Sequence, residues 1–429
     1  MGSQLADSPE VSAVEVSASR LFLWRNLPES TLAYLFTITL YSIASPLLSV
    51  FTTSFLVQQR NSPTEAMVFI GCQMGAIPVG FLLAGALLRH YSVGCLYAVG
   101  SFLVGCSTVG VACISTYAPT TFLAHMGIAL AGLLQGAIAG IYWSTRLMLA
   151  IELTNAKNRD VFFALESASV VAMSVIVPLT LGALIEYQFF VPGLFTRNTS
   201  FGVLLALVVA LLSIGAKVIL KNNFTVPIPT TLRLTSENSP KWRAARALLF
   251  SKGIIDGYIA ILPITLTLTY IGNEFALGLV QSICGLLCTV LVYALGSLIG
   301  TRVKRITVTK LAATVVTLAG VPLAIDASAL SVALFIAGSS IAMSLFWNTT
   351  TPPVLSAIEA CRTSEGETFA YTVDRELWLN FGRAVTILIM VSAYFYLGGA
   401  ETLAIIPIVF SPAQLLLVAA AQRLDESEE

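Results

Sequence analysis

The sequence has little charge. Only 11% of its 429 residues are Asp, Glu, Lys or Arg, whereas soluble globular proteins have about 25%. The 23 basic residues equal the 23 acidic ones, and there are two histidines. This shortage excludes a soluble globular surface and a disordered chain, since disordered segments are polar and charged. The even balance argues against nucleic-acid binding, which needs a basic excess or patch.

Motifs of enzyme chemistry are missing as well. The chain has no GxxxxGK(S/T) loop to hold the phosphates of ATP and no Gly-x-Ser-x-Gly nucleophile elbow. Neither histidine lies beside a cluster of Cys or carboxylates, and the seven cysteines are not spaced as metal ligands. We therefore expect no cofactor, no metal and no enzymatic reaction.

Long apolar runs are what the sequence has in abundance. Hydrophobic residues make up 56% of it, and the mean hydropathy is +0.85. A helix crosses a bilayer with about 20 apolar residues, and runs such as LLALVVALLSIGAKVIL do not alternate as barrel strands do. We predict an all-α membrane protein with twelve transmembrane helices, at about residues 31–55, 64–88, 93–115, 119–145, 161–187, 199–219, 247–271, 274–299, 307–326, 329–351, 370–397 and 401–422.

Lysine and arginine in the loops predict the orientation. The loops on the side of the termini hold nearly all basic residues outside the spans, whereas the opposite loops hold only Arg60 and Arg197. We therefore expect cytoplasmic termini in the plasma (inner) membrane, with no secretory signal because acidic residues precede the first long run. The predicted parts are a tail at 1–30, a six-helix bundle at 31–219, a basic cytoplasmic linker at 220–246, a second six-helix bundle at 247–422 and a tail at 423–429.

Similarities between the two bundles indicate an internal repeat, which many transporters contain. Trp143 and Trp347 each precede an Ala-Ile-Glu at the cytoplasmic end of a span. The following span in each bundle has an acid near its start, Glu166 in one and Glu376 in the other. A proline also lies inside the first span of each bundle. These matches predict two pseudo-symmetric six-helix halves.

The six-plus-six spans, cytoplasmic termini and basic central loop resemble the major facilitator superfamily. That family has a Gly-x-Leu-x-Asp-Arg-x-Gly-Arg-Arg-like signature after the second and eighth spans. The segments that begin at Gly85 and Gly296 are similar to it, although Arg89 and Gly300 replace its acid. The resemblance implies a secondary active transporter that moves one small solute across the lipid bilayer by alternating access.

Two further segments resemble signatures within that family. Gln135-Gly136 in the fourth span is similar to the Arg-x-x-Gln-Gly of proton-coupled members, with Gly132 in the place of the arginine. The segment from Pro178 to Gly182 is loosely similar to the Gly-Pro-rich signature of exporters. Neither segment assigns the subfamily.

Charges inside an apolar span are costly, so a deep charge predicts function. In the eleventh span Glu376, Asn380 and Arg383 are spaced i, i+4 and i+7, which places them on one helix face. We expect Arg383, midway along the span, and Asn380 to bind substrate and Glu376 to carry a proton. The alternative is that Glu376 and Arg383 pair with neighbouring helices. Asp374 and Arg375 are expected to form a gate or an interface pair.

The seventh span holds Lys252 and Asp256, whose i, i+4 spacing allows an ion pair. Asp256 is the deeper of the two and is a candidate proton carrier, and a static pair with Lys252 is the equal alternative. Tyr258 follows on the same span and is a candidate substrate-binding residue.

The fourth and fifth spans hold Arg146 and Glu166, which either line the cavity or form a cytoplasmic gate with Asp160. Glu166 is the third candidate proton carrier. Arg146, like Arg383, is a candidate anchor because guanidinium binds carboxylate or phosphate through two parallel hydrogen bonds. The remaining candidates for substrate contact are Trp143, Trp347, Asn348, Gln135 and Gln281. The two tryptophans have an alternative role as anchors at the membrane interface.

Together these residues predict a monomeric secondary active transporter of a small anionic or zwitterionic organic solute, with a proton as the coupling ion. An exporter of amphipathic drugs or metabolites is an alternative, which the many aromatic residues favour. A passive channel and a membrane-embedded enzyme or lipid-handling scaffold are alternatives of other classes.

Overall fold

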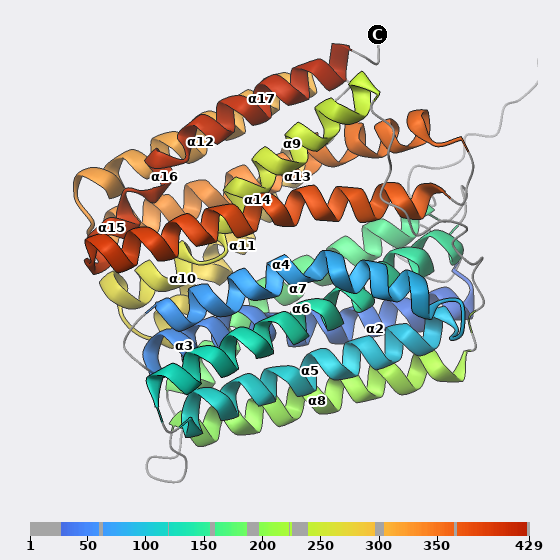
Figure 1. Ribbon diagram of the computed structural model, residues 1–429, viewed down its shortest axis with the longest axis horizontal. Coiled ribbons are helices and arrows are strands. Elements are labelled where there is room, and N and C mark those ends of the chain that lie inside the picture. The colour runs from blue at the N-terminus through green and yellow to red at the C-terminus, as the bar shows by residue number, and fades with distance from the viewer. Residues whose placement is uncertain are drawn as a thin grey trace, which may run out of the picture.

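The computed structural model describes residues 27–59, 63–118, 120–154, 159–186, 197–222, 224, 239–296, 304–363 and 367–426, without a few side chains inside these ranges. Every regular element in the described residues is helical (Figure 1). Most of the predicted N-terminal tail, the last three residues of the C-terminal tail, most of the predicted linker and residues 297–303 of the signature after the eighth span lie outside them.

The helices occupy the predicted spans in chain order. They are α2 (Glu29–Pro46), the π-helix η2 (Leu47–Phe51), α3 (Thr52–Gln59), α4 (Thr64–Leu87), α5 (Val93–Tyr117), α6 (Thr121–Glu152), α7 (Arg159–Glu186), α8 (Arg197–Lys221), α9 (Pro240–Ile259), α10 (Leu262–Leu266), the π-helix η4 (Thr267–Ile271), α11 (Glu274–Gly296), α12 (Arg305–Ile325), α13 (Ala329–Cys361), α14 (Thr368–Leu397), α15 (Gly399–Ala404), α16 (Ile406–Val409) and α17 (Ser411–Glu426).

The predicted all-helical membrane architecture is confirmed. Within the described residues, 11 helical stretches are long and apolar enough to cross a membrane. The predicted span at 274–299 is occupied by α11, whose described apolar part, Glu274–Val290, is shorter. The described chain therefore supplies eleven or twelve spanning helices.

Helix α9 begins earlier than hydropathy predicts, at Pro240 rather than near residue 247. The side chain of Ser239 accepts a hydrogen bond from the backbone N–H of Trp242 at 3.1 Å, and Pro240 occupies the first turn, where no N–H is required. Trp242 is fully buried. Capping and packing, rather than apolar length, thus determine where this helix starts.

Proline interrupts the first and seventh spans. Pro46 ends α2, and the π-helix η2 follows; Pro263 lies in α10, after a break from α9, and the π-helix η4 follows. Proline has no N–H to donate, and its ring clashes with the carbonyl four residues earlier. Two hydroxyls bond to backbone there. Thr52 donates to the carbonyl of Leu47, and Thr267 donates to that of Pro263, each at 2.6 Å.

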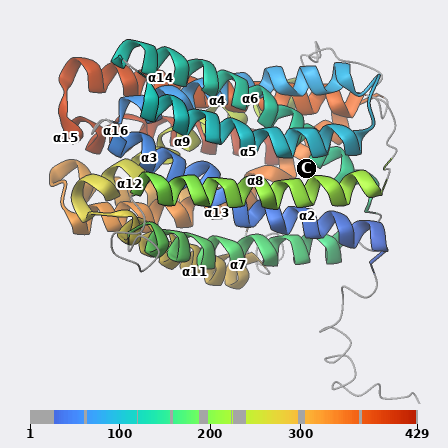
Figure 2. The ribbon, with the colours of Figure 1, turned by 90° about the horizontal axis from the view of Figure 1, so that it is seen from below.

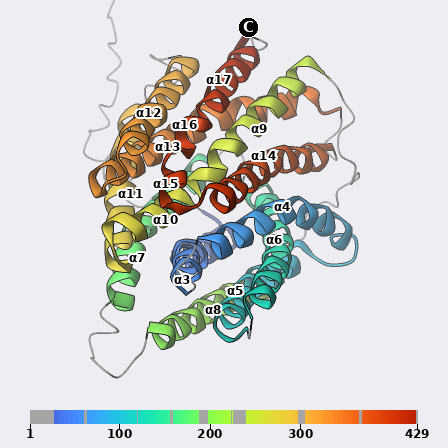
Figure 3. The same cartoon turned by 60° about the vertical axis from the view of Figure 1, so that its left-hand side comes forward.

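The helices run side by side, with α2 to α8 in the lower part of Figure 1 and α9 to α17 in the upper part. The two parts meet where α7 packs against α11 and α4 against α14 (Figures 2 and 3). Glycine allows the first of these contacts, since a Cβ on Gly278 would lie 2.2 Å from the carbonyl oxygen of Pro178. Helix α2 begins and α17 ends on the right-hand side of Figures 1 and 2.

Candidate functional site

Asp256 on α9 is held by two cations. Lys252 Nζ donates to its Oδ1 at 2.9 Å and to its Oδ2 at 2.7 Å. Arg383 of α14 donates from Nη2 to the same Oδ2 at 2.8 Å. The side chains of Lys252 and Asp256 are each 7% exposed. One buried carboxylate therefore joins a cation of its own helix to a cation of the neighbouring helix.

The polar contacts continue along α14. Arg383 Nη1 donates to Asn380 Oδ1 at 3.0 Å, and Asn380 Nδ2 lies 3.3 Å from Glu376 Oε2. Glu376 Oε1 lies 3.2 Å from Arg375 Nη1. We call this set the charge chain; its members are Lys252, Asp256, Arg383, Asn380, Glu376 and Arg375. It contains three cations and two carboxylates.

Glycines bring α9 and α14 close enough for this chain to form. A Cβ on Gly253 would lie 2.1 Å from the carbonyl oxygen of Leu379, and one on Gly382 would lie 2.3 Å from that of Phe250. No larger residue fits at either position without moving a helix. The close approach lets the Arg383 side chain reach Asp256.

Asp374 of α14 makes a second polar contact with α9. Its Oδ2 accepts hydrogen bonds from Trp242 Nε1 at 2.6 Å and from Arg246 Nε at 2.8 Å. Its side chain is 3% exposed, while Arg375 turns to Glu376 instead. Asp374 therefore ties the beginning of α9 to α14. The sequence did not predict Trp242 and Arg246 as partners of Asp374, because the span was expected to begin near residue 247, after both of them.

Another ion pair lies among helices α2 to α8 and joins α6 to α7. Arg146 Nη2 of α6 is 2.5 Å from Glu166 Oε1 of α7, and their side chains are 15% and 14% exposed. The guanidinium carbon is 4.7 Å from the ring centroid of Trp143, which is 40% exposed. Asp160, the expected third member of a gate, has its backbone in α7, but its side chain lies outside the described residues.

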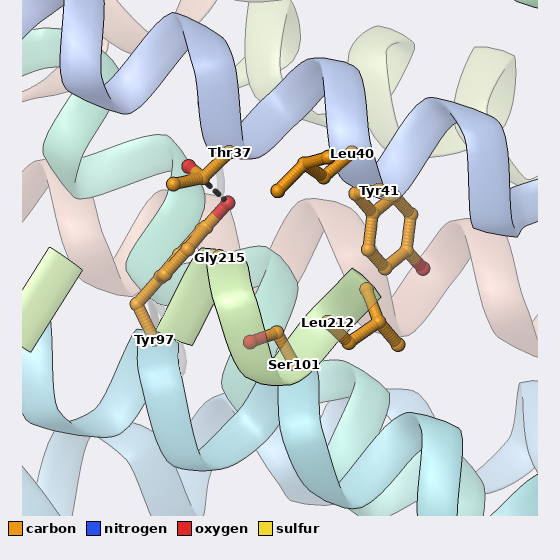
Figure 4. A pocket seen from close by; sticks show the side chains of 7 residues that line it. All are labelled: Thr37, Leu40, Tyr41, Tyr97, Ser101, Leu212 and Gly215. Carbon is orange, nitrogen blue, oxygen red and sulfur yellow. Dashed lines mark hydrogen bonds between the residues drawn. The ribbon is translucent and has the colours of Figure 1, made fainter. Parts of the chain in front are cut away.

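Aromatic side chains pack beside this ion pair. Tyr41 stacks on Tyr142 with ring centroids 4.3 Å apart and meets the edge of Trp143 at 5.9 Å. Tyr41 and Tyr97 also line a small pocket between α2, α5 and α8, in which Tyr97 and Thr37 share a 3.1 Å hydrogen bond (Figure 4). This packing holds Trp143 beside Arg146.

The remaining predicted residues fall into two groups. Trp347 on α13 is 56% exposed, and its ring centroid is 5.8 Å from Lys252 Nζ. Its neighbour Asn348 donates to the Ser344 carbonyl of its own helix at 2.9 Å. Trp347 therefore borders the charge chain, whereas the Asn348 amide is engaged within its own helix.

Other predicted polar residues lie in helix contacts. Gln135 is buried and donates to Thr108 of α5 at 3.0 Å. The buried Tyr258 accepts from Gln414 of α17 at 3.4 Å. Gln281 is half-buried on α11. The structure thus does not bring Gln135 and Tyr258 to the charge chain.

A buried carboxylate absent from the predicted site lies in the first turn of α4. Glu65 is fully buried, accepts from Ser115 of α5 at 3.2 Å, and lies 4.0 Å from His125 Nε2 of α6. An acid in the first helical turn interacts well with the helix dipole, so the sequence alone gave no reason to place it in a site. Among the described residues, no group of three or more His, Cys, Asp or Glu could hold a metal ion.

Solved structures share this fold. No family model matches the sequence, and no curated protein is similar to it in sequence. A mutant of the peptide transporter POT in complex with sulfate has a TM-score of 0.65 at 14% identity, over 92% of this chain and 95% of its own. POT family transporters in complex with a thioalcohol conjugated peptide (0.63, 15%) and with 5-aminolevulinic acid (0.61, 13%) have the same coverage. The chain therefore shares the all-helical fold of these membrane transporters.

Proposed function

We propose that this protein is a secondary active transporter that moves a small charged organic solute across a membrane by alternating access. Transporters of the same fold, whose structures hold sulfate, a conjugated peptide or 5-aminolevulinic acid, support the reaction class. They are transporters rather than enzymes. The solute is expected to be anionic or zwitterionic because cations outnumber carboxylates in the charge chain.

The charge chain is the observation that carries the proposal. A charge in the middle of a membrane costs from about 2.5 to more than 10 kcal/mol, so a chain of five charged side chains needs a reason. Holding α9 to α14 is not a sufficient one, because the glycine contacts at Gly253 and Gly382 and the Asp374 contacts already do so. Binding of a charged solute and coupling to a proton would explain why these charges lie in membrane-spanning helices.

Asp256 is the proposed site of proton coupling. Protonation would remove the negative charge that holds Lys252 and Arg383 together and would release both cations toward an anionic group. Glu376 and Glu166 pair with Arg375 and Arg146 respectively, and they are the second and third proposed proton carriers. In this scheme the Asp256 carboxylate and the anionic solute compete for the same cations, so protonation of Asp256 favours binding of the solute.

The proposed cycle uses two pseudo-symmetric halves, residues 31–219 and 247–422, joined by a cytoplasmic linker at 220–246. They would rock about the site through the α4–α14 and α7–α11 contacts. The chain would act as a monomer in the plasma (inner) membrane with both termini in the cytoplasm. The common side on which α2 begins and α17 ends supports the placing of both termini together.

A transport assay tests the proposal. A thermal-shift screen of the purified protein against charged metabolites would identify a ligand, because a bound ligand raises apparent stability. Uptake of that compound into proteoliposomes should then require an imposed proton gradient and should stop when a protonophore is added. Uptake that ignores the gradient would indicate a channel and would contradict the proposal.

A further inference from the structure

A small pocket lies between α9, α13 and α14, and two members of the charge chain line part of it. Its polar and aromatic lining consists of Lys252, Arg375, Trp347, Thr350 and Thr351. Neither carboxylate of the charge chain lines it, and none of its described lining residues is acidic. The lining therefore contains two cations and no carboxylate, and the carboxylates that pair with these cations lie outside the lining.

Both cations retain donors for a ligand. The Lys252 ammonium has three N–H groups, of which Asp256 takes two. Arg375 has five N–H groups, and its ion pair with Glu376 involves Nη1 alone. These donors come from two helices and line the same space, so they can meet one oxyanion together.

The two threonines differ in what they offer. Thr350 donates its hydroxyl hydrogen to the carbonyl of Phe346 at 2.7 Å, so its oxygen can only accept. The half-buried Thr351 makes no hydrogen bond with the described residues, so its hydroxyl is free to donate. Thr351 therefore adds a neutral donor to the two cations.

Trp347 supplies an apolar wall. Trp347 is 56% exposed although it lies within a helix that is long and apolar enough to span a membrane. It lies close to the Lys252 ammonium, at 5.8 Å from the ring centroid. A planar or aliphatic group can pack on the ring while its oxyanion meets the cations.

We propose that this pocket is the specificity site for an organic oxyanion, a carboxylate or a phosphoryl group attached to an apolar or aromatic body. Lys252, Arg375 and Thr351 bind the oxyanion, and Trp347 packs against the body. This inference rests on the proposed transport function and names its substrate class. It assigns anion recognition to Arg375 and Thr351, whereas Arg383 is engaged by Asp256 and Asn380 and acts in coupling.

Matched ligands test the pocket directly in the purified full-length protein. Benzoate and phenylphosphonate carry the two oxyanions on one ring, and benzyl alcohol is the neutral control. Each is titrated while tryptophan fluorescence is followed, and Trp347→Phe identifies the component that belongs to this ring. We expect a saturable change with one or both anions and a weaker response to benzyl alcohol. The anion that binds more tightly shows whether the pocket prefers a carboxylate or a phosphoryl group.

Variants show where the anion binds. Arg375→Gln should weaken anion binding about tenfold or more, because a hydrogen bond to a charged group contributes about 1.5–3 kcal/mol, and Thr351→Val should weaken it by less. Arg243→Gln, an exposed arginine on the same α9, should bind as the wild type does. Equal affinity for benzoate and benzyl alcohol, unchanged affinity in Arg375→Gln, or no saturable response to either anion would overturn the proposal.

The binding assay separates this inference from the proposed function. If the protein binds anions in this pocket but moves no solute in proteoliposomes, the specificity site is supported and the proposed transport function is contradicted. If the protein accumulates a cationic or neutral solute and does not respond to the anions, the transport function is supported and the specificity site is contradicted.

Discussion

At the scale of single residues, Asp256 is a buried carboxylate held between two cations. Its carboxylate faces Lys252 and Arg383 with little access to solvent. A buried ion pair adds little net stability compared with apolar packing, but removing one partner leaves the other charge buried and unpaired. Asp256 has two such partners, so its loss would leave two adjacent cations.

Asp256→Asn should therefore lower the free energy of unfolding by about 3–5 kcal/mol and abolish proton-coupled uptake. Unfolding in detergent and uptake into proteoliposomes measure the two effects. Asp326→Asn, at an exposed aspartate that ends α12, is the matched control and should change neither. A variant as stable and as active as the wild type would show that Asp256 does not hold the two cations.

Asp374 has a structural role by the same reasoning. It accepts hydrogen bonds from Trp242 and Arg246, both near the beginning of α9. Asp374→Asn should lower the melting temperature while the KM for uptake, measured on the folded fraction, stays unchanged. A shifted KM without loss of stability would instead give Asp374 the role of a gate.

At the scale of helices, much of the site could be predicted from spacing within one element. The Lys252–Asp256 pair follows from an i, i+4 spacing, and the Glu376, Asn380 and Arg383 face follows from helical periodicity. The bond from Arg383 to Asp256 could not be predicted, because it depends on which helices touch. That contact is set by glycines, whose small size is visible in a sequence but whose facing partner is not.

The sequence does not show which neighbours surround a buried polar residue. Hydropathy predicts a span only while the residues are apolar, so the first turns of α9 were assigned to a linker. There, Trp242 and Arg246 are engaged by Asp374. Gln135, a candidate for substrate contact, donates a hydrogen bond to Thr108 of a neighbouring helix. A single sequence gives the face of a polar side chain but not the neighbour that satisfies it.

The close packing of α9 on α14 gives an element-scale prediction. In Gly253→Ala the new Cβ would lie 2.1 Å from the Leu379 carbonyl oxygen, so the helices must separate. Overpacking of this kind costs about 1–3 kcal/mol, and separation would break the Arg383–Asp256 bond. We expect reduced stability together with loss of uptake.

Gly75→Ala on α4 is the matched control for this change. A Cβ at Gly75 would have nothing within 4 Å, so this variant should fold and transport as the wild type does. Normal uptake by Gly253→Ala would show that the close approach is not needed for the charge chain.

At the scale of the whole molecule, alternating access requires α4 and α14 to move against each other. A Cβ on Gly71 of α4 would lie 3.8 Å from the Cβ of Ile387 of α14, a separation at which disulfides form. The double variant Gly71→Cys with Ile387→Cys should cross-link under oxidation, lose uptake, and recover it on reduction. Mass spectrometry of the linked peptides and uptake before and after reductant measure the effect.

The control pair, Gly75→Cys with Ile387→Cys, moves one cysteine a turn along the same helix. Each single-cysteine variant reports any reaction of the seven native thiols, all of which are free. Full uptake by the cross-linked Gly71 and Ile387 variant would mean that α4 and α14 do not move during transport.

The central claim is that a membrane-embedded charge chain couples the movement of a solute to the movement of a proton. Its most direct test is gradient-driven accumulation of the identified ligand in proteoliposomes that contain either the wild type or Arg383→Ala, at matched amounts of folded protein. We expect accumulation above the external concentration with the wild type, and none with Arg383→Ala. Equal accumulation by the two proteins would contradict the account.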